Sequence, residues 1–257
     1  MGKTVAIVNQ KGGVGKTTTA VNLAAAIGKS GFRCLLCDID PQGNATSGLG
    51  ISKREVELST YDMIIGTGSA ESVLKETQFN RLSILPSSMK LAGAEIEIAS
   101  MDKRESRIKN AIAPIKGNYD FIILDCPPSL GLITLNALCA VDSVIVPIQC
   151  EYYALEGLSQ LMSTIRQVKR MYNPLIELEG VLLTMFDGRL NLTQQVVSEV
   201  KRFFPQKVYS TVIPRNVRLS EAPSFGQPVM YYDKSSKGAT AYEDFAEEFL
   251  RKNGKIK

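Results

Sequence analysis

The sequence Gln10-Lys-Gly-Gly-Val-Gly-Lys-Thr-Thr18 decides the fold that we expect for this chain of 257 residues. It follows a β-rich run, Thr4–Val8, and leads into a stretch from Thr17 to Lys29 whose apolar residues have helical spacing. Glycines between a strand and a helix let backbone N–H groups surround phosphate oxygens, and the positive end of the helix adds to the attraction. The stretch therefore predicts a nucleotide phosphate site.

Each position of this loop has an expected task, with ATP and Mg²⁺ as the expected cofactors. Lys16 is expected to reach the β- and γ-phosphates, and the Thr17 hydroxyl to coordinate Mg²⁺. The residues of the loop expected to bind the nucleotide are Gly12, Gly13, Val14, Gly15, Lys16, Thr17 and Thr18. The alternative is a glycine-rich turn without a ligand, and the Lys-Thr pair at the start of the helix argues against it.

Apolar strand-like runs alternate with helical stretches along the rest of the chain. These runs are Arg33–Asp38, Leu82–Leu85, Phe121–Asp125, Ser143–Pro147, Val181–Thr184 and Val208–Ile213. Continuous apolar strands separated by helices are typical of a mostly parallel sheet covered on both faces. The segment from Ser47 to Glu76 gives no clear prediction. Because no linker or repeat interrupts the pattern, we expect one doubly wound α/β domain over residues 1–257.

Carboxylates follow two of the predicted strands. Asp38 and Asp40 lie in Asp38-Ile-Asp-Pro-Gln-Gly-Asn44, and Asp125 ends the strand Phe121–Asp125. Open α/β sheets place their ligands at the carboxyl ends of the strands. An aspartate after four apolar residues, downstream of a phosphate loop, is typical of a Walker B strand that holds Mg²⁺ through its water shell. Asp40 would belong to this ligand site or, as the alternative, would cap the turn that follows the strand.

Composition excludes several classes of chemistry. The chain has no histidine, so it can form neither a Ser-His-Asp triad nor an imidazole metal site. Cys34 and Cys37 lie three apart on a predicted strand, so their side chains point to opposite faces and are poorly placed for a disulfide. Met1-Gly-Lys-Thr leads straight into a short apolar run, and no window approaches eighteen uninterrupted apolar residues. We expect a cytoplasmic chain.

The phosphate loop departs from the ordinary pattern G-x-x-x-x-G-K-[ST], because Gln10 stands at the first glycine position. Lys11–Thr17 instead resembles K-G-G-x-G-K-[ST], the motif of the deviant Walker A ATPases, at every position. Ile213–Pro228 resembles the C-terminal signature of the ParA/Soj partition ATPases within that family, and Pro127–Gly131 resembles their second switch segment. The resemblance covers residues 3 to about 252.

The resemblance implies roles for residues of the site. Lys11 would reach across a homodimer interface to the ATP of the partner, so that ATP binding and dimerisation are one event. Asp40 would orient the attacking water or act as base, which makes Lys11, Lys16 and Asp40 the expected catalytic residues. The expected metal-side residues are Thr17, Asp38 and Asp125. Pro214 and Asn216 would lie against the adenine, beside the segment Leu183–Asp187.

The resemblance also implies an ATP dimer that binds double-stranded DNA without reading its sequence, through phosphate contacts from Lys and Arg. Residues 163–237 carry 11 basic and six acidic side chains, although the whole chain has a net charge of only +4. Arg189 matches a basic position that the family uses for DNA contact, and Arg218 is the next best match. A ParB-type centromere-binding partner that accelerates slow hydrolysis and a nucleoid-associated location are implied as well.

MinD-type ATPases, which position cell division at membranes, are the main alternative. They share the phosphate loop but end in a basic amphipathic membrane helix. Here Gly254 interrupts the stretch Phe249–Lys257, which argues against such an anchor. The nitrogenase iron protein would need paired cysteines for an iron–sulfur cluster, and neither Cys126 nor Cys139 is placed for that role. We therefore expect an ATP-dependent DNA-binding switch.

Overall fold

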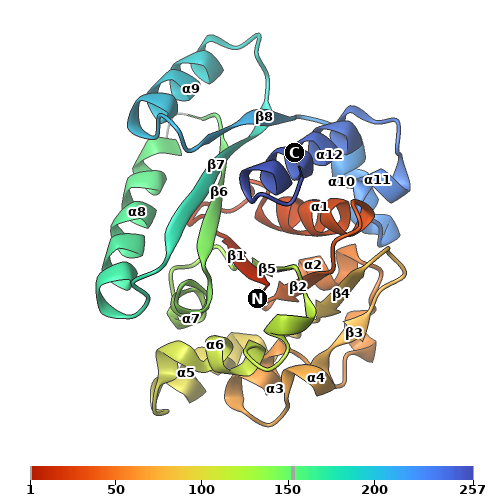
Figure 1. The fold of residues 1–257 in the computed structure, drawn as a ribbon, viewed down its shortest axis with the longest axis vertical. Helices are drawn as coiled ribbons and strands as arrows, with labels where there is room; N and C mark the ends of the chain where they lie inside the picture. The colour runs from red at the N-terminus through yellow and green to blue at the C-terminus, as the bar shows by residue number, and fades with distance from the viewer. Residues whose placement is uncertain (1, 152–153, 257) are drawn as a thin grey trace.

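Eight strands form one sheet in the computed structural model, which describes residues 2–151 and 154–256 (Figure 1). The strands are β1 (Lys3–Ile7), β2 (Cys34–Asp38), β3 (Lys75–Glu76), β4 (Leu82–Leu85), β5 (Phe121–Asp125), β6 (Ser143–Gln149), β7 (Glu177–Phe186) and β8 (Val208–Pro214). Their order is β3-β4-β2-β5-β1-β6-β7-β8, and every pair is parallel except β3 with β4. The predicted doubly wound, mostly parallel α/β fold is confirmed.

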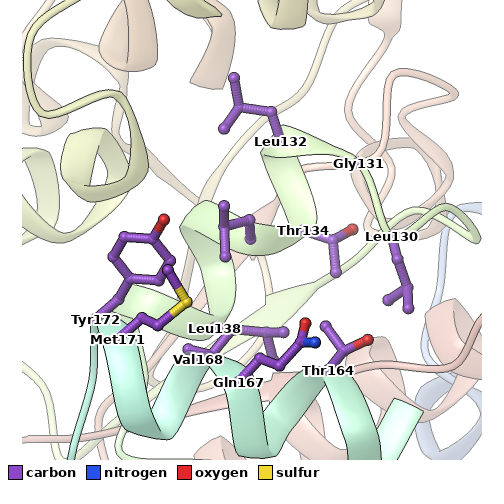
Figure 2. A pocket seen from close by; sticks show the side chains of 11 residues that line it. Leu130, Gly131, Leu132, Thr134, Leu138, Thr164, Gln167, Val168, Met171 and Tyr172 are labelled. Atoms are coloured by element: carbon purple, nitrogen blue, oxygen red, sulfur yellow. The ribbon is translucent and has the colours of Figure 1, made fainter. Parts of the chain in front are cut away.

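Helices cover both faces of this sheet. They are α1 (Lys16–Lys29), α2 (Asn44–Gly48), α3 (Thr60–Ile65), α4 (Ala70–Val73), α5 (Leu91–Ala99), α6 (Arg107–Ile112), α7 (Leu132–Ala140), α8 (Ala154–Met171), α9 (Asn191–Phe203), α10 (Val217–Glu221), α11 (Val229–Tyr232) and α12 (Lys237–Lys252). Helices α1, α11 and α12 pack on one face, whereas α3 and α5 to α9 pack on the other. Between α7 and α8 lies a cavity of about 480 Å³ that side chains of both helices line (Figure 2).

The two cysteines of β2 show how the sheet divides the core. Cys34 packs on the face that α1 and α12 cover, and Cys37 packs on the opposite face. Burial raises the pKa of both thiols above its usual range. The prediction that they point to opposite faces is confirmed. No helix among the described residues is long and apolar enough to cross a membrane.

Several strands differ from the expected runs by one or two residues, and two differ more. β7 begins at Glu177, four residues before the predicted run. The prediction was too short because charged side chains in the first residues of the strand interrupt the apolar pattern. β3, Lys75–Glu76, falls in the segment without a clear prediction, and it is a two-residue polar edge strand. Short charged edge strands protect a sheet against further pairing and leave no apolar periodicity to detect.

The strand order places the carboxyl ends of β1, β2 and β5 side by side. In the parallel registers, Asp125 is the partner of Ile7 on one side and of Asp38 on the other. The phosphate loop leaves β1 at this edge and enters α1, which packs back over the sheet. The three sequence motifs therefore meet at one edge of the sheet.

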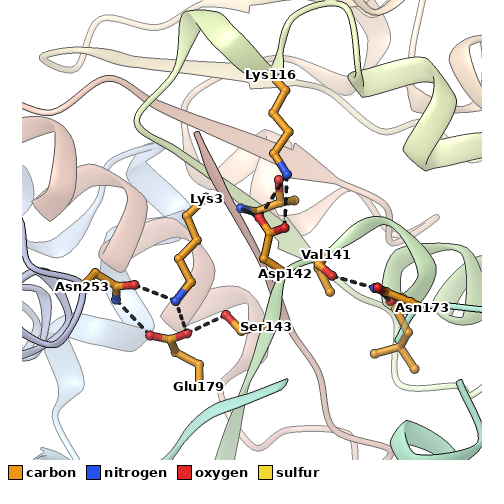
Figure 3. Close-up of polar contacts among 10 residues, drawn as sticks. Lys3, Lys116, Val141, Asp142, Ser143, Asn173, Glu179 and Asn253 are labelled. Carbon is orange, nitrogen blue, oxygen red and sulfur yellow. Dashed lines mark hydrogen bonds and ion pairs between the residues drawn. The ribbon is translucent and has the colours of Figure 1, made fainter. Parts of the chain in front are cut away.

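A polar cluster joins strands β1, β6 and β7 to the residue that follows α12 (Figure 3). The carboxylate of Glu179 on β7 pairs with the Lys3 ammonium, and it accepts hydrogen bonds from Ser143 Oγ at 2.6 Å and Asn253 Nδ2 at 2.9 Å. Burial alone would raise the pKa of Glu179, but the hydrogen bonds from Lys3, Ser143 and Asn253 outweigh it and leave the pKa below its usual value. The folded state therefore favours the charged carboxylate.

Glu179→Ala is expected to lower the free energy of unfolding by about 2–4 kcal/mol at neutral pH, because it leaves Lys3 without its buried partner. A carboxyl group whose pKa is depressed by folding stabilises above its unfolded pKa, so the difference should shrink as the pH falls below about 4. Denaturant unfolding measures it, with Glu177→Ala, an exposed position on the same strand, as the control. Equal stability of the two variants would contradict this role.

Candidate functional site

The phosphate loop has the backbone shape that its glycines predict. Gly13 and Gly15 have φ angles of 73° and 87°, in the left-handed region that favours glycine. Gly15 is the N-cap of α1, and neither a capping side chain nor an acidic residue in the first turn occupies this helix end. The first N–H groups of α1 and its positive dipole end are therefore available to an anion.

Lys16 lies inside this loop. Its side chain is almost fully buried, and its Nζ donates to the backbone oxygen of Lys11 at 2.9 Å. Burial lowers the pKa of Lys16, while the nearby Asp125, Cys126 and Asp40 act in the opposite direction. The ammonium thus stands between the loop backbone and the carboxylates that the sequence predicted.

Asp125 is fully buried at the end of β5, and neither of its carboxylate oxygens has a hydrogen-bond partner of normal geometry among the described residues. Burial raises its pKa well above the usual range and Asp38 adds to this, whereas the Thr17 hydroxyl and Lys16 oppose the rise. Buried carboxylates are normally paired or face a cation. The two unsatisfied oxygens beside Thr17 therefore fit a site for a hydrated Mg²⁺, which keeps several waters and takes few protein ligands.

Asp38, the register partner of Asp125, has a different environment. Its Oδ2 accepts hydrogen bonds from the backbone N–H of Thr46 at 2.8 Å and from the Thr46 hydroxyl at 2.7 Å, and its Oδ1 accepts one from the Asp40 N–H at 3.2 Å. Burial raises the pKa of Asp38 to about 6, although these hydrogen bonds lower it. Asp38 therefore fixes the turn that follows β2, and both of its carboxylate oxygens already have hydrogen-bond donors.

Asp40 makes the capping contact considered for it, and it also lies close to the phosphate loop. Its Oδ1 accepts a hydrogen bond from the Gln42 N–H at 2.9 Å, which is the predicted turn-capping contact. Its backbone oxygen accepts one from Ser87 Oγ at 2.7 Å. At the same time the carboxylate lies near enough to Lys16 and Asp125 to influence the pKa of each. Turn capping and a place at the phosphate site coexist.

A cavity of about 320 Å³ lies beside the end of the phosphate loop and the start of α1. Its lining includes Gly15 and Thr18 of the loop, Thr184 and Met185 of β7, and Pro214, Arg215, Asn216, Leu219 and Tyr242. The Thr184 hydroxyl ties β7 to the loop through a 2.8 Å hydrogen bond to the Val14 oxygen. The cavity thus brings together the positions expected for the adenine, Pro214 and Asn216, with the start of α1. Leu219 and Tyr242 were missed, because apolar and aromatic residues of this kind are usually core residues.

Lys11, the additional lysine of this motif, pairs with a residue outside the phosphate loop. The Lys11 ammonium forms an ion pair with Glu151, which follows β6, and both side chains are partly exposed. Glu151 was not predicted as a site residue, since an isolated carboxylate after a strand gives no signal of its own. Lys11 is therefore held at the surface beside the phosphate site.

Arg189 and Arg218, the expected DNA contacts, are exposed and lie on different elements. Arg189 follows β7 and makes two hydrogen bonds to the carboxylate of Asp187, at 2.8 and 2.6 Å. Arg218 on α10 pairs with Glu221 at 2.7 Å and with Asp233 at 3.1 Å. Each guanidinium has an acidic neighbour that a DNA phosphate would have to replace.

Comparisons with known proteins agree on the family of this chain. A family model described as an AAA domain matches residues 2–178. The sporulation initiation inhibitor protein Soj of Bacillus subtilis is 58% identical over 248 residues, which are 96% of this chain and 98% of that protein. The chromosome partitioning protein ParA of Myxococcus xanthus is 50% identical over 253 residues, 98% of this chain and 89% of that protein.

Solved structures repeat the fold. The crystal structure of cobyrinic acid a,c-diamide synthase from Mycobacterium smegmatis with bound ADP and magnesium is 37% identical, has a TM-score of 0.87, and the match covers 98% of this chain and 95% of that chain. The septum site-determining protein MinD of Pyrococcus horikoshii with Mg-ADP is 27% identical, with a TM-score of 0.81 and full coverage of both chains. The high identity to Soj and ParA, over almost the whole of this chain, decides between these relatives. The chain belongs to the ParA/Soj family of chromosome-partitioning P-loop ATPases.

Proposed function

We propose that this chain is an ATP-driven switch for DNA partitioning, which binds ATP and Mg²⁺, dimerises, binds DNA without reading its sequence, and resets by slow hydrolysis. The observation that carries the proposal is the edge of the sheet where Lys16 and the unsatisfied Asp125 carboxylate meet an uncapped start of α1. A cation site beside an anion site is what a magnesium–triphosphate complex requires. We treat residues 1–257 as one functional domain.

The residues of the site have complementary tasks in this proposal. The N–H groups of the loop and Lys16 bind the phosphate oxygens, and the cavity with Pro214 and Asn216 holds the base. Thr17 would hold Mg²⁺ directly and Asp125 would hold it through water, and this would supply positive charge to the phosphates. Asp40 orients the attacking water, with its turn fixed by Asp38 and Ser87. Positioning does most of the work in phosphoryl transfer, which is consistent with slow turnover in a chain without histidine.

Dimerisation completes the proposed site. Lys11 lies at the surface and is paired with Glu151 of its own chain. A surface ion pair contributes little to stability, so an ATP phosphate in the partner's loop can replace Glu151 as the partner of Lys11. The motif that distinguishes this loop then links ATP binding to dimer formation.

Proposed DNA binding uses the basic excess of residues 163–237, which a dimer presents twice. Contacts to phosphates from Arg189 and Arg218 would hold the dimer on nucleoid DNA, and a ParB-type partner would accelerate hydrolysis and release it. The names of the Soj and ParA relatives support the partitioning role.

A MinD-like membrane role is the second candidate, because MinD shares the fold. Helix α12 offers no free apolar face for such a role. The apolar face of α12, the final long helix, is formed by residues such as Tyr242, Phe245 and Phe249, which are buried against the sheet and α1. An amphipathic helix binds a membrane through its apolar face, and here that face is already covered.

Lys16→Ala is expected to weaken ATP binding about 100-fold, which corresponds to about 2.8 kcal/mol, because it removes the buried cation of the phosphate loop. Lys29→Ala removes the same charge from the exposed end of the same helix, and it should leave the affinity unchanged. Equilibrium titration with a fluorescent ATP analogue measures both. Unchanged affinity of Lys16→Ala would refute the assignment of the phosphate loop.

Asp40→Asn separates the two roles of Asp40, because the amide oxygen still caps the turn but carries no charge. If Asp40 orients the attacking water, both Asp40→Asn and Asp40→Ala should lower kcat about 100-fold or more while ATP still binds and dimers still form. Steady-state hydrolysis and sedimentation of the same samples measure this. Full activity of Asp40→Asn would leave only the capping role.

The wild-type chain is expected to sediment with non-specific DNA when ATP is present and not when it is absent. Arg189→Ala should weaken this binding and reduce the slope of log affinity against log salt by about 1. Arg104→Ala, an exposed arginine between α5 and α6, is the control for loss of charge. Binding to anionic vesicles in place of DNA would favour the MinD-like role.

A further inference from the structure

Helix α7 begins without a cap of its own. Its N-cap residue is Gly131, and its first turn carries no acidic side chain. The cap comes instead from α5: Glu95 Oε1 accepts a hydrogen bond from the N–H of Ile133 at 3.0 Å. A carboxylate at this end of a helix satisfies a free donor and interacts well with the helix dipole. Figure 2 shows the start of α7, where Leu130 and Gly131 lead into Leu132.

The close approach of Glu95 explains the glycine at position 131. Gly131 has φ −77° and ψ −169°, an extended backbone that any residue adopts. A Cβ atom at this position, however, would lie 2.2 Å from Glu95 Oε1 and 2.8 Å from Oε2. A side chain at position 131 would therefore displace the Glu95 carboxylate, so the contact between Glu95 and the start of α7 depends on this glycine.

The hydrogen bond from Ile133 to Glu95 fixes one end of the segment that starts at Asp125. Residues 126–131 connect Asp125 at the end of β5 with the first residue of α7. The Thr134 hydroxyl donates to the backbone oxygen of Ser129 at 2.6 Å, so the first turn of α7 holds the middle of the segment. The position of this helix end therefore determines the path of the chain as it leaves Asp125.

The N-terminal end of α5 follows the segment that contacts the Asp40 turn. Ser87, just before α5, donates from its hydroxyl to the Asp40 oxygen at 2.7 Å and from its N–H to Thr46 Oγ1 at 2.9 Å. Leu91, Ala94 and Ile98 bury one side of α5 in the core, so the helix is a rigid connection. Both catalytic segments are attached to it, one through Ser87 and the other through Glu95.

We propose that Glu95 is a positioning residue for hydrolysis. Its carboxylate caps α7 and thereby holds residues 126–131 in a fixed position relative to the Asp40 turn. Glu95 does not touch the nucleotide in this proposal, and it acts through the backbone of α7. The proposal rests on the ATP hydrolysis proposed above. It predicts an effect on turnover rather than on nucleotide affinity, because the phosphate loop and the base cavity lie on other elements.

Glu95→Ala is expected to lower kcat about tenfold, or about 1.4 kcal/mol in the barrier, with the Kd for nucleotide changed less than about twofold. Glu95→Gln should retain kcat within about twofold, since its amide oxygen still accepts from Ile133. Glu97→Ala is the matched control: it removes a carboxylate two residues away on the same helix, where the partner is the Tyr61 hydroxyl. Steady-state hydrolysis, nucleotide titration and thermal unfolding are measured for each variant.

A double-mutant cycle keeps the test decisive if loss of the cap also lowers Tm. Gly131→Ala alone should reduce kcat because its Cβ displaces the Glu95 carboxylate, but in the Glu95→Ala background it should cost nothing further. Additive effects of the two substitutions, or an unchanged kcat in Glu95→Ala, would overturn the positioning role. A wild-type chain that does not hydrolyse ATP would instead overturn the proposed function itself.

Discussion

Two buried carboxylates next to each other are the constraint on which the rest of this structure depends. Asp38 and Asp125 are register partners on neighbouring strands, and both are removed from water. Such a pair is unfavourable unless positive charge or hydrogen-bond donors surround it. Asp38 is satisfied by the turn that follows β2, whereas Asp125 faces Lys16 and the start of α1. Within the described part of the chain, the Asp125 carboxylate is thus left without hydrogen-bond donors of normal geometry beside the phosphate loop, where a bound cation would stabilise it.

Much of this arrangement follows from the sequence, because three motifs each couple a strand to a functional residue. Once the apolar runs are assigned to a parallel sheet, the carboxyl ends of the strands must meet at one edge, and Lys16, Asp38 and Asp125 come together. The cavity beside Gly15 was predictable only in part. Pro214 and Asn216 were expected beside the adenine from a family signature, whereas Leu219 of the same signature and Tyr242 are ordinary apolar or aromatic residues whose place in the cavity depends on the tertiary fold.

The contacts that sequence reasoning missed have a common physical cause. Thr46 at Asp38, Glu151 at Lys11 and Glu95 at Gly131 are side chains whose partners lie far away in the sequence or across a turn. Neither periodicity nor composition distinguishes them from surface residues. A glycine in an extended conformation, such as Gly131, likewise gives no sign that a carboxylate from another helix fills its missing side-chain volume.

The polar cluster at Glu179 has a consequence for how the chain is made. Lys3 and Asn253 are hydrogen-bonded although they are 250 positions apart, and the phosphate loop begins directly after the strand that carries Lys3. During synthesis, β1 emerges from the ribosome long before β6 and α12 are available to surround it. Contacts of such long range form late and slowly. The strand that leads into the phosphate loop therefore gains this contact only after residue 253 has been synthesised.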